Sequence, residues 1–412
     1  MARSVNVEAG MTAAARAVAV PFTLGMRWAR HGLGARSDEL PPVRWTLGLV
    51  SKVVLDDIFF ISELASATFV SLGHRHRLAS EIEGCLELYA DRGWLQDPAS
   101  YHQAPPPLSD VSYEDVSTAF KNHSHQRIAF ESGYEPHVDE PGRERWLGWE
   151  ANRTGHAWLF EHPGEPRPWV VCVPGYRMGR PLIDKVGFRV KWLHRELGLN
   201  VAIPVMPLHG PRNVGRRNGD HFLSGDFVDT VHAQSQAVWD TRRLMGWLRG
   251  RGAPDIAVYG VSLGGYTAAL LSSLDSDLDL SIIGIPATDF VALLESHMPD
   301  FAVSWAGRLG LPFDSLRQLL KVISPLAMPP VVPHDRRFLY AASVDGLAAP
   351  TQARELWRHW GRPRLDWYEG SHVSFLWEKK VERLVADALS AAGMIAPDAF
   401  AARGRARSML TR

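Results

Sequence analysis

Residues 255–270 read Asp-Ile-Ala-Val-Tyr-Gly-Val-Ser-Leu-Gly-Gly-Tyr-Thr-Ala-Ala-Leu. An apolar run typical of a buried strand leads into Gly260–Gly264 (Gly-Val-Ser-Leu-Gly), and an apolar helix follows directly. The turn in this G-x-S-x-G pattern is so tight that the residues two before and two after the serine must lack bulk. It raises Ser262 Oγ at the edge of the sheet and points the N-terminus of the helix at it, which favours developing negative charge. The pattern therefore predicts a nucleophilic serine.

Around this turn, from about residue 145 onward, short apolar runs alternate with amphipathic segments. The expected strands are Ala157–Phe160, Trp169–Val173, Val201–Val205, Ile256–Tyr259, Ser281–Ile285, Phe338–Ala342 and Leu365–Tyr368. The expected helices are Lys185–Leu197, Phe227–Arg249, Gly265–Leu274, Thr351–Trp360 and Phe375–Ala391. Strands that alternate with helices imply β-α-β units and a mainly parallel sheet covered on both faces. The fold class is therefore expected to be α/β.

With this motif in this setting, residues 145–392 resemble the α/β-hydrolase superfamily. The C-terminal signatures also resemble the branch called alpha/beta hydrolase domain-containing eighteen-type. The resemblance implies an eight-stranded, mostly parallel sheet flanked by helices. It further implies a catalytic triad that follows the chain order serine, acid, histidine.

A serine hydroxyl is a weak nucleophile, so it needs a base and a third group that orients the base. His372 follows the last expected strand and a turn of small residues, where the superfamily places its base. Asp345 follows the preceding strand and is expected to be the acid. Asp289, after the strand at 281–285, is the competing acid, although its position also suits the N-cap of a helix.

An oxyanion hole needs two backbone donors. One is expected to be the N–H of Leu263, next to the nucleophile. The other is expected in the loop after Trp169–Val173, where Tyr176 N–H is the first choice and Arg177 N–H the second. Gly175, Arg177 and His209 are candidates for lining the substrate site. His209 precedes Ser262 in the chain, so it is expected to be a pocket or structural residue and not the base.

The chain divides into unequal parts. Residues 1–144 are expected to form a helical N-terminal extension and connector, and residues 145–392 the catalytic domain. Residues 288–334 carry apolar side chains without a clear strand, which favours a cap insertion over the end of the sheet; ordinary packing helices are the alternative. Residues 393–412 form a basic tail.

Composition excludes several other classes of protein. The 412 residues include 45 basic and 45 acidic side chains, so the protein has no net positive charge to attract nucleic acid. The two cysteines show no zinc-ligand spacing and suit a cytoplasmic setting, and no phosphate-binding glycine loop follows a strand. We therefore expect no cofactor and no metal. Contact with a membrane surface is open only at the two arginine-bearing ends. Residues 11–35 suit a basic amphipathic helix, for which packing on the domain is favoured over a membrane contact, and the tail after Phe400 is favoured as a solubilising tail over an anionic-surface contact.

The expected function is a serine hydrolase that cleaves a carboxylic ester, with a hydrophobic acyl group, through an acyl-enzyme. An acyltransferase would use the same triad with an alcohol or thiol in place of water. A catalytically silent hydrolase fold that binds a partner through its helical extension is the alternative from another class.

Overall fold

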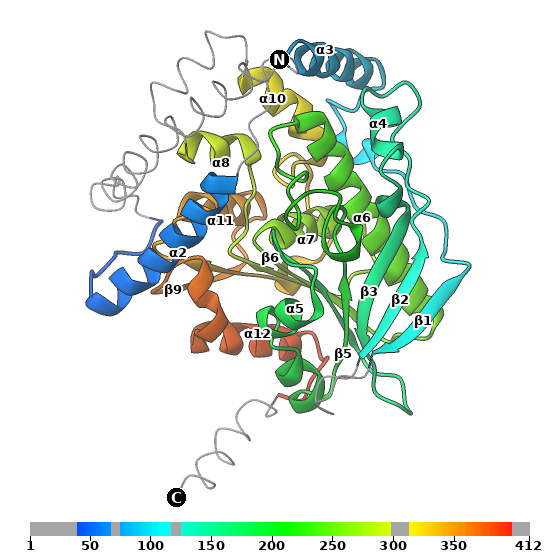
Figure 1. Ribbon diagram of the computed structural model, residues 1–412. Coiled ribbons are helices and arrows are strands. Elements are labelled where there is room, and N and C mark those ends of the chain that lie inside the picture. The colour runs from blue at the N-terminus through cyan, green and yellow to red at the C-terminus, as the bar shows by residue number, and fades with distance from the viewer. Residues whose placement is uncertain (1–38, 67–74, 117–124, 298–312, 398–412) are drawn as a thin grey trace, which may run out of the picture.

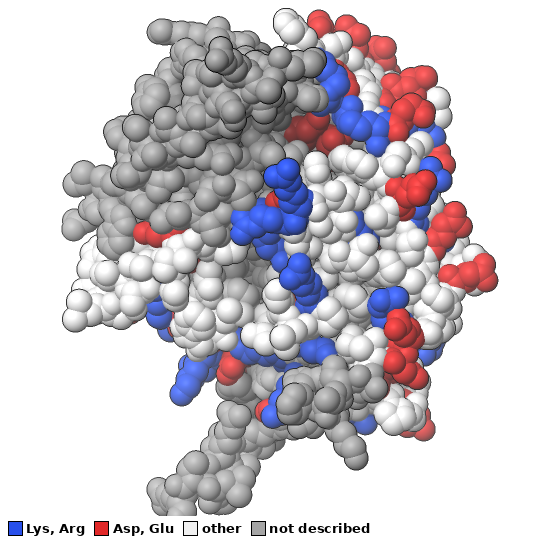
Figure 2. Space-filling model, in the orientation of Figure 1, with Lys and Arg blue, Asp and Glu red and all other residues white. Residues whose placement is uncertain are grey.

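The computed structural model describes residues 39–66, 75–116, 125–297 and 313–397. A central sheet crosses the molecule, and helices lie on both of its faces (Figure 1). The helix expected within residues 11–35 lies outside the described residues, as does most of the basic tail. On the face shown in Figure 2, Asp and Glu side chains gather mainly along the right-hand rim, and several Lys and Arg side chains lie near the centre.

The sheet is mixed and has nine strands in the described residues, in the order β1-β2-β3-β5-β4-β6-β7-β8-β9. The pairs β1–β2, β2–β3 and β3–β5 are antiparallel, and all pairs from β5 to β9 are parallel. The strands are β1 Val111–Val116, β2 His125–Glu131, β3 Thr154–Phe160, β4 Trp169–Val173, β5 Asn200–Pro204, β6 Ile256–Val261, β7 Leu280–Gly284, β8 Arg337–Ala342 and β9 Arg364–Tyr368.

The prediction of an α/β sheet with mostly parallel strands is confirmed, but the sheet has one strand more than the eight expected. The strands β1 and β2 form an antiparallel edge and lie within the residues assigned to the N-terminal extension and connector. Within the described residues, the sheet therefore begins at Val111, ahead of residue 145.

Ten α-helices are described. They are α2 Leu47–Ser66, α3 Arg75–Asp91, α4 Arg143–Leu147, α5 Pro181–Gly187, α6 Phe227–Gly250, α7 Leu263–Leu274, α8 Phe290–His297, α10 Phe313–Leu319, α11 Pro350–His359 and α12 Lys379–Ala391. The helices α8 and α10 lie in the segment expected to be a cap. No helix in the described part of the chain is both long and apolar enough to cross a membrane.

Short helical turns complete the chain. They are the π-helix η5 Lys191–Glu196 and the 3-10 turns η2 Pro98–Tyr101, η4 Glu150–Arg153, η6 Gly210–Arg212, η7 Leu320–Ile323, η8 His334–Arg336 and η9 Val373–Trp377. The prediction of a single helix at Lys185–Leu197 is wrong, because the helical conformation is interrupted between α5 and η5. Arg189 takes a positive φ of 47° there, and its guanidinium donates to Phe375 O at 2.5 Å.

The central strands are buried on both faces, and successive side chains enter opposite cores. In β4, Val171 and Val173 join the core under α6 and α7, whereas Val170 and Cys172 join the core under η5 and α12. Strands buried on both sides read as continuous apolar runs, as β4 and β6 do. Two layers of helix thus hold the carboxyl ends of the parallel strands in fixed positions.

The helix α2 packs beside the end of the sheet that carries β8 and β9 (Figure 1). Its buried side chains Leu49 and Val53 contact Val344, the second residue after β8. A segment from the N-terminal extension therefore lies against the loop after β8.

Candidate active site

The turn between β6 and α7 holds Ser262 in a strained backbone conformation, with φ 57° and ψ −119°. A non-glycine residue at such angles persists only where its surroundings enforce them. Here the Ser262 N–H donates to Gly284 O at 3.0 Å. The flanking glycines are required by close packing, since a Cβ on Gly264 would overlap the carbonyl of Val173 and one on Gly260 would overlap the carbonyl of Gly264.

Three residues expected to form the triad lie within hydrogen-bond distance of one another. His372 Nε2 is 2.9 Å from Ser262 Oγ, and His372 Nδ1 is 2.7 Å from Asp345 Oδ2. Each follows a parallel strand: Ser262 follows β6, Asp345 follows β8 and His372 follows β9. Side chains from distant parts of the sequence meet because the carboxyl ends of these strands lie at one edge of the sheet.

Asp345 is held in place by its second oxygen. Its Oδ1 accepts from the N–H groups of Leu347 at 2.9 Å and Ala348 at 2.7 Å, which leaves Oδ2 for His372. Burial acts to lower the pKa of His372, but the charge and hydrogen bond of Asp345, with the charge of Asp56, raise that pKa on balance. Imidazolium is thus stabilised at this position.

The competing acid, Asp289, has other hydrogen-bond partners. Its Oδ1 accepts from the N–H groups of Val291 at 2.8 Å and Ala292 at 2.9 Å. These amides belong to the first turn of α8, which is the helix-capping role expected as the alternative for this residue. The structure therefore brings His372 to Asp345, and it gives Asp289 a place at the start of a helix.

The loop after β4 lies directly against the serine turn. A Cβ on Gly175 would be 3.1 Å from Val261 O and 3.4 Å from Ser262 Cβ, so the backbone of this loop contacts the serine turn. The amides on either side of Tyr176 are engaged: Gly175 N–H donates to Met178 Sδ at 3.1 Å, and Arg177 N–H donates to His209 Nε2 at 3.3 Å. The contact to His209 disfavours Arg177, the second choice, as an oxyanion donor.

His209 supports this loop as a neutral acceptor. Its Nδ1 is 2.8 Å from Pro207 O, which fixes the proton on Nδ1 and leaves Nε2 to accept from Arg177. Burial lowers the pKa of His209 to about 4, and the positive charge of Arg177 adds to this effect. The Arg177 guanidinium in turn pairs with Asp220 at 2.6 Å. His209 therefore positions the loop next to Ser262.

Sequence reasoning missed one carboxylate near the triad. Asp56, on α2, is fully buried and its oxygens accept from the backbone of Gly346, His372 and Val373. The available signal was spacing: Asp56 falls on the same helical face as Leu49 and Val53, so an acid stands where an apolar side chain is expected.

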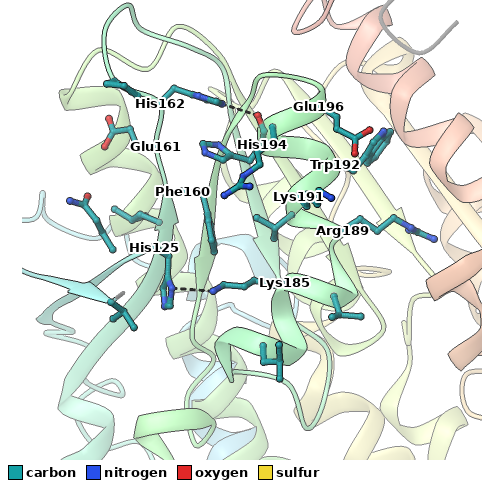
Figure 3. Close-up of a pocket in the computed structure, with 18 of the residues that line it drawn as sticks. His125, Phe160, Glu161, His162, Lys185, Arg189, Lys191, Trp192, His194 and Glu196 are labelled. Atoms are coloured by element: carbon teal, nitrogen blue, oxygen red, sulfur yellow. Dashed lines mark hydrogen bonds between the residues drawn. The ribbon is translucent and has the colours of Figure 1, made fainter. Parts of the chain in front are cut away.

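A separate cleft of about 910 Å³ lies between the edge strands and the segment from α5 to η5 (Figure 3). Lys185 Nζ lies 3.1 Å from His125 Nδ1 in it, and the rings of His162 and His194 stack at 3.9 Å. None of the three triad residues lines this cleft. Among the described residues, no cluster of His, Cys, Asp or Glu could hold a metal ion.

The fold is that of acetyl xylan esterase 1 from Thermoanaerobacterium sp. JW/SL YS485, with a TM-score of 0.51 and 13% identity over 74% of this chain and 93% of that chain. Together with the serine turn, the sheet order defines an α/β-hydrolase fold. The eighteen-type branch stays a prediction.

The chain also has relatives that are similar to it over most of its length. It is 40% identical over 376 residues to two proteins of Mycobacterium tuberculosis, Rv2627c of strain H37Rv and MT2702 of strain CDC 1551, both described as uncharacterized. The alignment spans 89% of this chain and 88% of each relative, so the chain belongs to the same family as these mycobacterial proteins. No protein-family model matches the sequence.

Proposed function

We propose that this protein is a serine hydrolase that cleaves a carboxylic ester through an acyl-enzyme. The observation that carries the proposal is the continuous chain of hydrogen bonds from Asp345 through His372 to Ser262. Nucleophile, base and orienting acid are the three parts that activate a serine hydroxyl. Both contacts are of hydrogen-bond length, so the base is placed to take the serine proton.

In the first half of the reaction, Ser262 Oγ attacks the carbonyl carbon and its proton passes to His372 Nε2. The tetrahedral intermediate collapses, the C–O bond to the alcohol breaks, and His372 protonates the leaving alkoxide. In the second half, His372 takes a proton from water, whose oxygen attacks the acyl-enzyme. This second tetrahedral intermediate collapses, and the bond between the acyl carbon and Ser262 Oγ breaks. His372 returns the proton to Ser262 Oγ, and the carboxylic acid is released. Asp345 keeps the imidazole in the required tautomer throughout.

The negatively charged oxygen of each tetrahedral intermediate needs hydrogen-bond donors where Ser262 faces the loop after β4. We assign this role to the N–H groups of Leu263 and Tyr176. Leu263 opens α7, whose N-terminal dipole favours negative charge at this point. Tyr176 belongs to the loop that contacts the serine turn through Gly175. Loss of one such donor typically costs about 10²–10³ in rate.

The acyl group is proposed to be hydrophobic, since the segment between β7 and β8 supplies apolar side chains near the carboxyl edge of the sheet. Phe290 of this segment is buried and its ring stacks at 4.2 Å on Tyr266 of α7, the helix that begins next to Ser262. An acyl pocket built on these side chains would favour acyl chains over polar or charged groups.

Hydrolysis of p-nitrophenyl esters of graded acyl length tests both parts of this proposal. We expect the full-length protein to hydrolyse the esters, with kcat/KM rising with acyl length, and Ser262→Ala to reduce kcat/KM by at least about 10⁴. Equal activity of the Ser262→Ala protein would refute the catalytic assignment. A flat response across chain lengths would refute the hydrophobic acyl group alone. Products formed with added alcohols would instead indicate acyl transfer.

A further inference from the structure

We propose that Asp56, contributed by α2 of the N-terminal extension, is a positioning residue of the active site. It holds the two turns that carry Asp345 and His372 and places a second negative charge beside the imidazole. This inference rests on the proposed function. It assigns a role in the reaction to a segment of the chain in which the sequence motifs showed no chemistry.

The contacts of Asp56 join both turns. Its Oδ2 accepts from Gly346 N–H at 3.0 Å and from His372 N–H at 2.8 Å, and its Oδ1 accepts from Val373 N–H at 3.0 Å. Gly346 directly follows the acid, and the other two amides are those of the base and its neighbour. One carboxylate therefore ties the backbone of the acid turn to the backbone of the base turn.

Burial of the Asp56 carboxylate costs free energy unless hydrogen-bond donors compensate for the lost water. The residue has no exposed surface, and a buried carboxylate that lost its donors would be strongly destabilising. Burial raises the pKa of Asp56, and the nearby charge of Asp345 raises it further, whereas His372 and the donated backbone hydrogen bonds act in the opposite direction. The pKa of Asp56 is raised on balance, and the backbone donors of the two turns that it joins favour its ionised form.

His372 consequently lies between two carboxylates. Asp345 bonds its side chain and Asp56 bonds its main chain. The charges of both acids raise the pKa of His372. Two further titratable groups border the base turn: Tyr368 donates its hydroxyl to Ser371 O at 2.9 Å, and Glu378 is paired with Lys52 at 2.5 Å.

A second contact from α2 acts on the same segment. Lys52 lies one helical turn before Asp56, and its Nζ donates to Glu369 O at 2.9 Å as well as to Glu378. These two acceptors lie on either side of His372 in the sequence. Apolar packing of Leu49 and Val53 on Val344 completes the contact next to Asp345. The helix α2 therefore engages both sides of the base turn and the residue before the acid.

The test compares Asp56→Asn with Asp275→Asn in the full chain. Asp275 serves as a control because it is also a buried carboxylate, which accepts one backbone N–H and pairs with Arg249 at 3.0 Å, but it follows the far end of α7 from Ser262. The rate of reaction with a fluorophosphonate probe and kcat/KM for p-nitrophenyl acetate are measured over a pH series. An asparagine keeps the shape but removes the charge and turns an NH₂ group toward at least one backbone donor.

For Asp56→Asn we expect kcat/KM to fall roughly 10- to 100-fold. We also expect the acid limb of the pH profile to move to lower pH by about 0.5 to 1 unit, because loss of a negative charge lowers the pKa of the base. Asp275→Asn should leave both quantities unchanged. A lower rate with an unmoved limb is the result of a purely structural role and would overturn the inference, as would a wild-type rate and profile.

Two further outcomes are distinguishable. If Asp56→Asn does not fold, Lys52→Met decides, because the side chains of Lys52 and of its partner Glu378 are both partly exposed, so the change leaves no fully buried charge unpaired. A several-fold loss of labelling rate in Lys52→Met supports the role of α2, and an unchanged rate overturns it. Failure of the wild-type protein to react with the probe would refute the proposed function itself, and this inference with it.

Discussion

Replacing Asp345 with asparagine changes one atom of the triad and has a defined geometric consequence. The Oδ1 atom of Asp345 accepts two backbone N–H groups, from Leu347 and Ala348, while Oδ2 accepts from His372. An asparagine keeps its only oxygen where two donors require it, so its NH₂ group faces His372 Nδ1. The imidazole must then accept at Nδ1 and carry its proton on Nε2, opposite Ser262 Oγ.

A base that carries its proton toward the nucleophile cannot accept another, so the serine loses its activation. The expected fall in kcat/KM for Asp345→Asn is about 10⁴, which corresponds to about 5 kcal/mol of transition-state stabilisation. Stability should change much less, because the two backbone hydrogen bonds of the side chain remain.

The assay is hydrolysis of p-nitrophenyl acetate, with the thermal midpoint of each variant measured in parallel. Asp289→Asn is the matched control, since it also alters a carboxylate that accepts two backbone N–H groups. Near-full activity of Asp345→Asn together with loss of activity in Asp289→Asn would refute the reasoning and transfer the acid role to Asp289.

Three other outcomes are expected. The pKa of His372 is raised above its ordinary value of 6.5 and the base must be neutral, so kcat/KM should rise with pH along a limb centred above 6.5. Protonated His372 also contributes to the free energy of unfolding at low pH, and this contribution is lost as pH rises through the raised pKa. Arg212→Met leaves the buried carboxylate of Asp240 without its partner at 2.8 Å, so unfolding free energy should fall by about 3–5 kcal/mol in denaturant titrations. His209→Ala removes the acceptor of Arg177 N–H and should lower both the thermal midpoint and kcat/KM, the latter about 10-fold; unchanged kinetics would contradict its role in holding the loop.

The central part of the sheet could be predicted because its strands are short apolar runs between turns, and β4 was expected with the bounds that it has. The strand β1 could not be predicted in this way. Its sequence, Val-Ser-Tyr-Glu-Asp-Val, forms an edge whose middle four residues are exposed, so it lacks the alternation of apolar side chains that marks a half-buried strand. Pairing with β2 defines it as a strand, and that pairing is a tertiary property.

The break between α5 and η5 has a similar origin. Helical periodicity continues through residues 185–197, but the chain turns at Arg189, whose side chain bonds the backbone of Phe375 nearly two hundred residues later. The Met178 side chain also packs so closely on Gly187 that a Cβ there would lie 2.7 Å from its Cε. Local sequence does not contain contacts of this kind.

Within the site, the three triad residues could be predicted from their positions and their order along the chain, whereas Asp56 could not. Ser262, Asp345 and His372 each follow a strand in the order that the superfamily implies. Asp56 precedes all three by about two hundred residues or more and acts on backbone amides, which any sequence supplies. Only the placement of α2 against β8 and β9 brings it there.

The most direct test of the central claim is covalent modification of Ser262 in the folded protein. After reaction with one equivalent of a fluorophosphonate probe, intact-mass analysis and peptide mapping should show a single adduct on Ser262, with none in Ser262→Ala or in heat-unfolded protein. An unlabelled folded protein, in the presence of a control esterase that is labelled, would contradict the account, as would an adduct at another residue.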